Sequence, residues 1–341
     1  MKPPLRRALT LVVLLHLLIL AAAFVGPYDG TFQDREHTFS PPTRIHFVDS
    51  NGQLHARPFV YATTADPERF GEYKEDVTRA YPLRFLVPGA EYRLLGVFRT
   101  RIHLFGVEEP AKVFLMGTDQ FGRDQFSRLL AGGQTSLLAG LLAAALSVLG
   151  GGLLGAAAGF FGRLADTVIM RLADVFLSLP WLYLLFAIRA FLPLHLDPEA
   201  TLYLLTAVIG MVGWARPARL VRGIVLSAKE RNFVLASRHF GASELYLLGR
   251  HILPQTYGVL LTQATLLIPQ YVLAEVTLSF VGLGVGEPSP SWGTMLAALQ
   301  QYHVLQSYWW MFLPAGLMIM VFASYFLLAA QLQGRLKSTQ F

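Results

Sequence analysis

The stretch QTSLLAGLLAAALSVLGGGLLGAAAGF, residues 134–160, decides the class of fold. It carries no charged side chain, and it exceeds the roughly 20 apolar residues that a helix needs to cross about 30 Å of hydrocarbon. Gly151, Gly155 and Gly159 recur at every fourth position, which lets another helix approach closely on that face. The pattern fits a dimer contact or packing within one chain, and we expect packing within the bundle.

The composition of the whole chain agrees with a membrane protein. Of its 341 residues, 54% are hydrophobic and only 15% are charged, whereas about a quarter are charged in soluble domains. The net charge of +6 could indicate a nucleic-acid partner. The basic residues, however, lie mainly at the ends of apolar segments, and no nucleic-acid-binding motif is present. The absence of cysteine excludes disulfides, thiolate metal sites and cysteine nucleophiles. We therefore expect an integral membrane protein with no nucleic-acid partner.

Six apolar stretches are long enough to span a bilayer. The first could be a signal peptide, because Lys2, Arg6 and Arg7 precede it, but its apolar core is longer than a usual signal sequence, and we expect an uncleaved helix. The six predicted spans are Ala8–Val25, Gln134–Phe160, Asp166–Leu192, Thr201–Val225, Thr256–Val281 and Tyr308–Leu332.

The distribution of positive charge predicts the orientation. The amino tail, the loop at residues 227–254 and the carboxyl tail carry Lys and Arg, whereas the short loops around His195–Glu199 and Gly282–Gln306 carry neither. Because positively charged loops stay in the cytoplasm, we expect both termini and the 227–254 loop to be cytoplasmic.

Residues 26–116 form a separate predicted domain outside the membrane, between the first span (residues 1–25) and the remainder (residues 117–341). Thr43–Asp49 and Gln53–Tyr61 flank Ser-Asn-Gly, a good hairpin signal, and Tyr81–Val87 and Tyr92–Val107 also look extended. We expect a small β-rich module. Four histidines could bind a metal, but they show no ligand spacing, and we favour scattered surface histidines: His37, His46, His55 and His103.

The cytoplasmic loop reads SAKERNFVLASRHFGASELYLLGRHILP, residues 227–254. Ser227 and Glu230 fit a capping box that starts a helix. Gly241 can end that helix in the left-handed conformation, Ser243 can cap a second one, and Pro254 should break the second helix before the membrane resumes.

One apolar stripe runs along this loop. Phe233, Ala236 and Phe240 recur at helical spacing on an otherwise polar helix. Two interpretations remain open from the residues alone: an amphipathic connector that lies on lipid, or a hairpin that docks a soluble partner.

Ionisable residues within the spans are candidates for a translocation path or gate. Glu275 should face the bundle interior, either as a pore or gate residue together with Ser279 or as a structural partner of Arg189 or of backbone donors, and a structural role is favoured. Arg189 is expected to snorkel to the outer interface. Arg216, Arg219 and Arg222 recur at every third position, as interfacial anchors or as a basic collar of the path. We also expect kinks at Pro180 and Pro217.

The string GTDQFGRDQFSRLL, residues 117–130, precedes the second span. Thr118 or Asp119 can cap a short interfacial helix. The apolar residues of the string would then face lipid: Phe121, Phe126, Leu129 and Leu130.

Several catalytic motifs are missing from the chain. There is no G-x-x-x-x-G-K-[ST] phosphate loop, no G-x-S-x-G elbow and no H-E-x-x-H site. We expect no catalytic residue, no metal site and no cofactor bound by this chain.

The 227–254 loop resembles the EAA coupling loop of binding-protein-dependent ABC transporter permeases. Leu235-Ala236-Ser237 occupies the EAA position, followed by Gly241 and by Leu253-Pro254. Leu235 replaces the family's glutamate, so docking should depend more on shape and apolar contact. The resemblance assigns the coupling role to this set: Leu235, Ala236, Ser237, Arg238, Gly241, Ala242, Leu253 and Pro254.

Residues 117–130, Asp166–Pro180 and Leu273–Met295 are similar to the dipeptide, oligopeptide and nickel branch of that family. The resemblance covers Gly117 to about Pro314, and the branch's usual carboxyl-terminal motif is missing. It implies an all-α inner-membrane permease of the type I importer kind, in contact with lipid. It also implies a homologous second permease, two ATPase subunits that hold ATP and Mg²⁺, and an extracytoplasmic binding protein that delivers peptides or a similar solute.

Two other functions are compatible with the residues. An ion-driven secondary transporter or channel would use Glu275 and need no ATPase. A membrane-anchored ectodomain protein would bind a ligand through residues 26–128, but it leaves the cytoplasmic hairpin unexplained.

Overall fold

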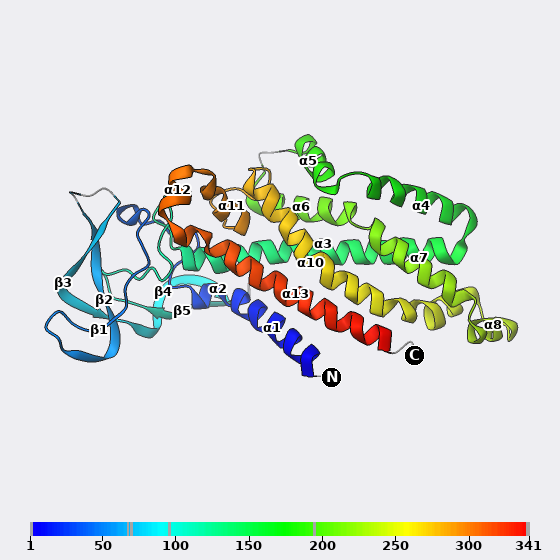
Figure 1. Cartoon of the computed structure of the whole chain (residues 1–341), viewed down its shortest axis with the longest axis horizontal. Coiled ribbons are helices and arrows are strands. Elements are labelled where there is room, and N and C mark those ends of the chain that lie inside the picture. Colours follow the sequence, from blue (N-terminus) through cyan, green and yellow to red (C-terminus); the bar gives the residue numbers. More distant parts are fainter. Residues whose placement is uncertain (1–2, 67, 69–70, 95–96, 194–195, 339–341) are drawn as a thin grey trace. The chain divides into compact units, whose positions relative to one another are not determined.

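A computed structural model describes residues 3–338, apart from residues 67, 69–70, 95–96 and 194–195 (Figure 1). The loop predicted at His195–Glu199 therefore begins outside the described residues. The chain forms two compact units. Unit 1 consists of Met1–Val12, Leu137–Leu278 and Val321–Phe341, and unit 2 of Val13–Ser136 and Ser279–Met320.

Three helical runs are long and apolar enough to cross a membrane. They are α3 (Gln125–Phe161), the run Glu244–Phe280 that ends in α10 (Tyr257–Phe280), and the run Trp309–Arg335 that contains most of α13 (Leu313–Ser338). Their mean hydropathy reaches 2.2, 1.4 and 2.1. They correspond to the second, fifth and sixth predicted spans, and the run at Glu244 begins well before the predicted Thr256.

The third and fourth predicted spans are each a bent pair of helices. Helices α4 (Arg163–Ser178) and α5 (Trp181–Phe191) meet at 94°, and Pro180 lies at the break, as predicted. Helices α6 (Pro198–Val212) and α7 (Ala215–Lys229) meet at 40°. The kink predicted at Pro217 is wrong, because the bend lies at Gly213 and Trp214. Pro217 sits in the first turn of α7, where a missing N–H breaks no helical hydrogen bond.

The segment predicted as the first span contains two helices. These are α1 (Pro3–Leu20) and the short α2 (Ala22–Val25), with Ala21 between them. With each bent pair taken as one span, the described residues offer up to five spans, and the crossing by the amino-terminal segment remains a prediction.

The glycine stripe of α3 packs against α7 within unit 1. A Cβ added to Gly151 would lie 2.8 Å from Pro217 Cβ, one on Gly155 would lie 2.8 Å from Ala218 Cα, and one on Gly159 would lie 2.9 Å from Val225 Cβ. Larger side chains would therefore push the two helices apart. The prediction that this stripe packs within the chain is confirmed.

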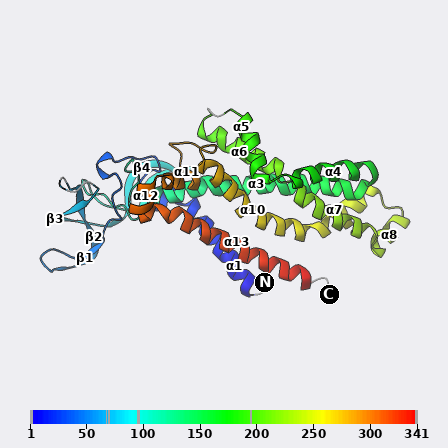
Figure 2. The ribbon, with the colours of Figure 1, turned by 45° about the horizontal axis from the view of Figure 1, so that its top comes forward.

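Helices α4 and α7 lie side by side (Figure 1 and Figure 2), and ion pairs join them. Arg222 donates to both carboxylate oxygens of Asp166, at 2.5 and 2.6 Å, and Arg219 pairs with Asp174. The expected role of Arg219 and Arg222 as interfacial anchors remains a prediction. Their guanidinium groups have carboxylate partners on the neighbouring helix.

Unit 2 contains two antiparallel sheets. The first has the order β1 (His46–Val48), β2 (Leu54–Ala65) and β3 (Tyr73–Pro82). The second pairs β4 (Arg84–Leu94) with β5 (Phe98–Gly106). The predicted hairpin is confirmed, because Val48 pairs with Leu54 around a turn in which Gly52 has φ +79°.

The four histidines of this region have separate structural roles. His46 contacts Glu75 and His55 contacts Asp49. His37 and His103 are buried, so the description of all four as surface residues is wrong for these two. No group of three or more potential ligands gathers anywhere in the described part of the chain.

The segment that precedes α3 is buried through charge pairing. Arg123 donates to Asp119 (Nε to Oδ2, 2.7 Å) and to Glu287 (Nη2 to Oε1, 3.0 Å), and Arg128 also donates to Glu287 (3.2 Å). Asp119 caps a turn here and no short helix forms. Leu129 and Leu130 are buried, so their predicted contact with lipid is wrong.

Asp124, at the end of this segment, is a fully buried carboxyl group. Its Oδ2 accepts hydrogen bonds from the N–H (2.8 Å) and the hydroxyl (2.6 Å) of Ser127. Desolvation by burial nevertheless raises the pKa of Asp124 to about 6, because removal from water disfavours the charged form.

We predict that Gly155→Ala destabilises unit 1 by about 1–3 kcal/mol, because the new methyl group overlaps the Ala218 backbone. The measurement is equilibrium unfolding of the purified chain in detergent. Gly152→Ala is the matched control, since its methyl group would lie 3.5 Å from a flexible Leu260 side chain and should be neutral or stabilising. Equal stability of the two variants would contradict the close packing of α3 on α7.

We predict that Asp124→Asn changes the pH dependence of unfolding. The pKa of Asp124 is higher in the folded protein than in the unfolded chain, where it is about 4. Its contribution to the free energy of unfolding is therefore greatest below about pH 4 and is lost as the pH rises through about 6. The asparagine variant should lack this loss, which is on the order of 3 kcal/mol. Thermal unfolding of both proteins from about pH 4 to pH 7 measures the difference, and parallel pH profiles would refute it.

Candidate functional site

The 227–254 hairpin begins where α7 ends. Helix α7 continues to Lys229, and α8 (Asn232–His239) follows after a two-residue break. The predicted capping box of Ser227 and Glu230 is wrong, because Ser227 lies inside α7. Buried Ala228 extends the apolar stripe of α7 past Val225, where the fourth predicted span ends.

Gly241 ends α8 as predicted. Its φ is +85°, in the left-handed region that glycine adopts without strain. The Gly241 N–H donates to the Arg238 carbonyl (3.0 Å), and the Ala242 N–H donates to the Ser237 carbonyl (3.1 Å). This pair of bonds is a Schellman motif, which fixes the direction in which the chain leaves the helix.

The second arm of the hairpin is a distorted but continuous helical run. Ser243 caps α9 (Glu244–Tyr246) as predicted, with its hydroxyl accepting from the Tyr246 N–H. A π-helical turn, η2 (Leu247–Ile252), and a 3-10 turn, η3 (Leu253–Thr256), then lead into α10. The prediction that Pro254 breaks the helix is wrong. The change from π to 3-10 spacing accommodates a residue that has no N–H to donate.

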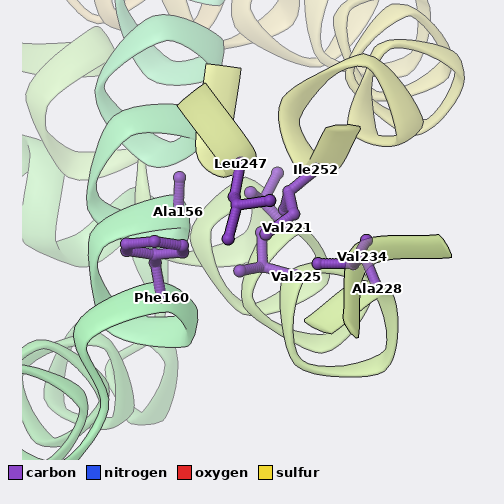
Figure 3. Packing of buried hydrophobic residues seen from close by; sticks show 8 residues of the cluster. All are labelled: Ala156, Phe160, Val221, Val225, Ala228, Val234, Leu247 and Ile252. Carbon is purple, nitrogen blue, oxygen red and sulfur yellow. The ribbon is translucent and has the colours of Figure 1, made fainter. Parts of the chain in front are cut away.

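One face of the hairpin is anchored in a hydrophobic cluster of unit 1 (Figure 3). Val234 of α8 is fully buried there, and Lys229 adds a hydrogen bond from its Nζ to the Phe160 carbonyl (2.8 Å) at the end of α3. The hairpin is thereby attached to the ends of both α3 and α7. The members of this cluster are Ala156, Phe160, Val221, Val225, Ala228, Val234, Leu247 and Ile252.

The opposite face of the hairpin is apolar and open. Phe240 is 91% exposed and Phe233 is 46% exposed, and Ala236 between them is exposed too. Leu245 and Tyr246 of α9 are also exposed, at 78% and 53%. We call these five residues the open face. The predicted stripe is confirmed as a surface feature, and it extends onto α9.

The other predicted coupling residues lie between these two faces. Leu235, Ser237 and Arg238 are half-buried, and Arg238 pairs with Glu244 across the turn (3.1 Å). Ala242 and Leu253 pack against the anchoring cluster, and Pro254 is exposed. Sequence reasoning missed Val234, Leu245 and Tyr246, because the helical phase of α8 and α9 depends on which residues their neighbours cover.

The predicted path residues lie in different environments. Glu275 is fully buried on α10. Ser279 is buried as well, and its hydroxyl accepts from the Val285 N–H (3.1 Å). Arg216 is exposed and lines a cavity of about 130 Å³ together with Gln270 and Tyr271.

Arg189 caps the end of α5. Its Nη1 donates to the carbonyl of Pro193 (2.9 Å), and the residue is only 1% exposed. The expectation that Arg189 snorkels to the interface is therefore wrong, because carbonyls at the end of its own helix satisfy the guanidinium. Its pairing with Glu275 remains a prediction.

Comparison with known proteins identifies the family. Residues 151–338, more than half of the chain, match the family described as binding-protein-dependent transport system inner membrane component. Similar curated proteins include the oligopeptide transport system permease protein OppC of Bacillus subtilis (strain 168), 38% identical over 211 residues (61% of this chain, 66% of the relative). The di/tripeptide transport system permease protein DppC of Pseudomonas aeruginosa (strain UCBPP-PA14) is 41% identical over 210 residues (61% and 66%).

The dipeptide transport system permease protein DppC of Bacillus subtilis (strain 168) is 36% identical over 207 residues, which cover 60% of this chain and 62% of the relative. The chain thus spans slightly less than two thirds of the length of these three relatives. Because the family match covers more than half of the chain and includes the whole hairpin, the chain belongs to the inner-membrane components of binding-protein-dependent transport systems, the permease subunits of ABC importers.

Proposed function

We propose that this chain forms part of the membrane path of an ABC importer and that its 227–254 hairpin docks a separate ATPase subunit. The observation that carries the proposal is the two-sided hairpin: one face is buried against α3 and α7, whereas the residues of the open face stay exposed among the described residues of the chain. The exposure of Phe240 and of Leu245 on one hairpin is costly in water unless another protein covers these side chains.

The construction of the hairpin supports a mechanical role. Val234, Leu247 and Ile252 pack with residues of α3 and α7, so a force on the open face passes into those helices. Interiors at native density transmit displacement because they hold few voids. Movement of the ATPase would thereby shift the equilibrium between two states of the bundle, through contacts that differ between the states.

We further propose the remaining parts of the importer. The amino-terminal segment and the two bent pairs would complete six crossings, with both termini in the cytoplasm and the β-rich region outside. ATP and Mg²⁺ would be held by two ATPase subunits, since this chain has no phosphate-binding loop. A second, homologous permease would complete the path, and an extracytoplasmic binding protein would deliver the cargo.

We propose peptides as the cargo class. The three relatives described above are named as oligopeptide, di/tripeptide and dipeptide permeases, and the similarity to each covers 60–61% of this chain. Glu275, Ser279 and Arg216 are the candidate path residues. Leu235, where the family has glutamate, is a half-buried apolar side chain beside the open face, in keeping with docking through apolar contact.

The buried Glu275 favours one alternative, an ion-driven secondary transporter or channel. One experiment distinguishes the two functions. The purified chain in vesicles would move solute along an ion gradient under the alternative, whereas the importer requires the ATPase.

We predict that Phe240→Ala weakens ATPase docking at least about tenfold, as loss of a central aromatic contact does at protein interfaces. The chain's own stability should change by less than about 0.5 kcal/mol, because the side chain is exposed. Co-purification of ATPase with the tagged permease measures docking. Val234→Ala is the control, since it should lower stability by about 2 kcal/mol while the open face stays intact. Undiminished co-purification of the Phe240→Ala variant would argue against docking on the open face.

We predict that Gly241→Val abolishes transport-coupled ATPase activity while membrane insertion stays intact. No neighbouring atom lies within 4 Å of a Cβ added at Gly241, so we attribute the effect to the left-handed backbone, which costs a β-branched residue about 1–2 kcal/mol or more. Gly241→Asn should retain most activity, because asparagine tolerates this conformation. A normal rate of transport-stimulated ATP hydrolysis in the valine variant would contradict the coupling role of the hairpin.

A further inference from the structure

Strands β4 and β5 form a two-stranded ribbon in unit 2 that the proposed function does not use. Near the tip of the ribbon, Leu94 pairs with Phe98 and Arg93 pairs with Arg99. Because paired residues of antiparallel strands share a face and neighbours along a strand alternate, one face of the tip is apolar and the other is basic.

The ribbon lies against α2, the end of the apolar amino-terminal segment. Both strands contact α2 (Figure 1), and His103 Nδ1 lies 2.8 Å from the carbonyl oxygen of Gly26, directly after α2. Pro27 and Tyr28, further along the chain, line a hollow with Gly106 at the base of the ribbon. From base to tip the ribbon therefore runs back along α2 in the direction of α1.

That direction leads to an exposed apolar part of α1. The last turns of α1 leave large apolar side chains open, with Leu17 56% and Leu20 50% exposed. The tip of the ribbon is equally open, with Val97 72% and Phe98 68% exposed. Both surfaces belong to elements that adjoin α2, and exposed apolar surface of this kind is expected where a bilayer supplies the cover.

The arginine pair indicates an anion at the same place. Arg93 and Arg99 are direct cross-strand partners and both are exposed. Like charges in this arrangement destabilise a sheet. Within the described part of the chain neither arginine has a carboxylate partner, whereas Arg101, on the same strand, pairs with Glu91 (3.2 Å). A phosphate group between Arg93 and Arg99 would remove the repulsion through charge-assisted hydrogen bonds.

We propose that the β4–β5 ribbon is a membrane-surface anchor. Val97 and Phe98 enter the interfacial layer of the bilayer, and Arg93 and Arg99 bind the phosphates of phospholipid headgroups. The anchor holds the β-rich region at a fixed position above the membrane, next to the end of the amino-terminal helix.

The absence of cysteine allows a direct test with single labels. A nitroxide is attached to Val97→Cys, which keeps Phe98 intact, and the complete chain is placed in lipid nanodiscs that hold one copy each. Leu54→Cys is the control, since Leu54 is 79% exposed at the other hairpin. Accessibility to a water-soluble nickel reagent and to oxygen is measured by electron paramagnetic resonance. We expect the label at position 97 to be shielded from nickel and reached by oxygen, and the label at position 54 to be open to nickel.

The arginines are tested in the same discs, with phosphatidylglycerol or with phosphatidylcholine alone. Arg93→Gln combined with Arg99→Gln should lower the docked-to-free ratio about fivefold per arginine in phosphatidylglycerol, and Arg57→Gln, an exposed arginine of β2, should not. Equal nickel access at positions 97 and 54 overturns the proposal. Shielding that appears only in discs with two copies, or only after a partner protein is added, also overturns it, because a protein then covers the ribbon.

Discussion

The close approach of α3 to α7 is the contact on which the rest of unit 1 depends. Three glycines on one face of α3 let the backbone and small side chains of α7 come within contact distance, where any larger residue would hold the helices apart. In a membrane, where lipid offers apolar side chains no incentive to associate, such close packing is a main source of helix association. The ends of both helices then form the floor on which the hairpin rests.

The hairpin is built with two unlike faces, and this asymmetry supports its proposed role. A helix that only lay on lipid would have no need of a second apolar face buried in protein. Here Val234 is buried in the cluster, while Phe240 is open. The Schellman motif at Gly241 fixes the angle between the two arms, and the Arg238–Glu244 pair spans the same turn. A hairpin that transmits movement from a partner to the membrane helices needs an exposed contact surface and a rigid attachment to those helices. Phe240 belongs to the first and Val234 to the second.

Unit 2 contains two different arrangements of charged side chains. The buried guanidinium groups of Arg123 and Arg128 are paired with Glu287, which is 45% exposed, and Arg123 also pairs with buried Asp119, since a buried charge requires a partner. On the β4–β5 ribbon, two arginines are placed opposite each other and left exposed. In the first arrangement the carboxylate partners come from the chain itself, whereas the arginines of the second have no carboxylate partner among the described residues.

The sequence by itself determined the membrane class, the principal long apolar helices, the β-hairpin at Gly52, the ends of α8 and α9 at Gly241 and Ser243, and the family. These features depend on hydropathy, on residues with special backbone freedom and on motif spacing, which are all local. Tertiary structure alone decided that Pro254 lies in a continuous run, that the bend of the fourth predicted span lies at Gly213, that Arg219 and Arg222 pair with α4, and that Val234 faces inward. Each of these depends on which neighbour covers a side chain or satisfies a backbone group, and that neighbour is distant in the sequence.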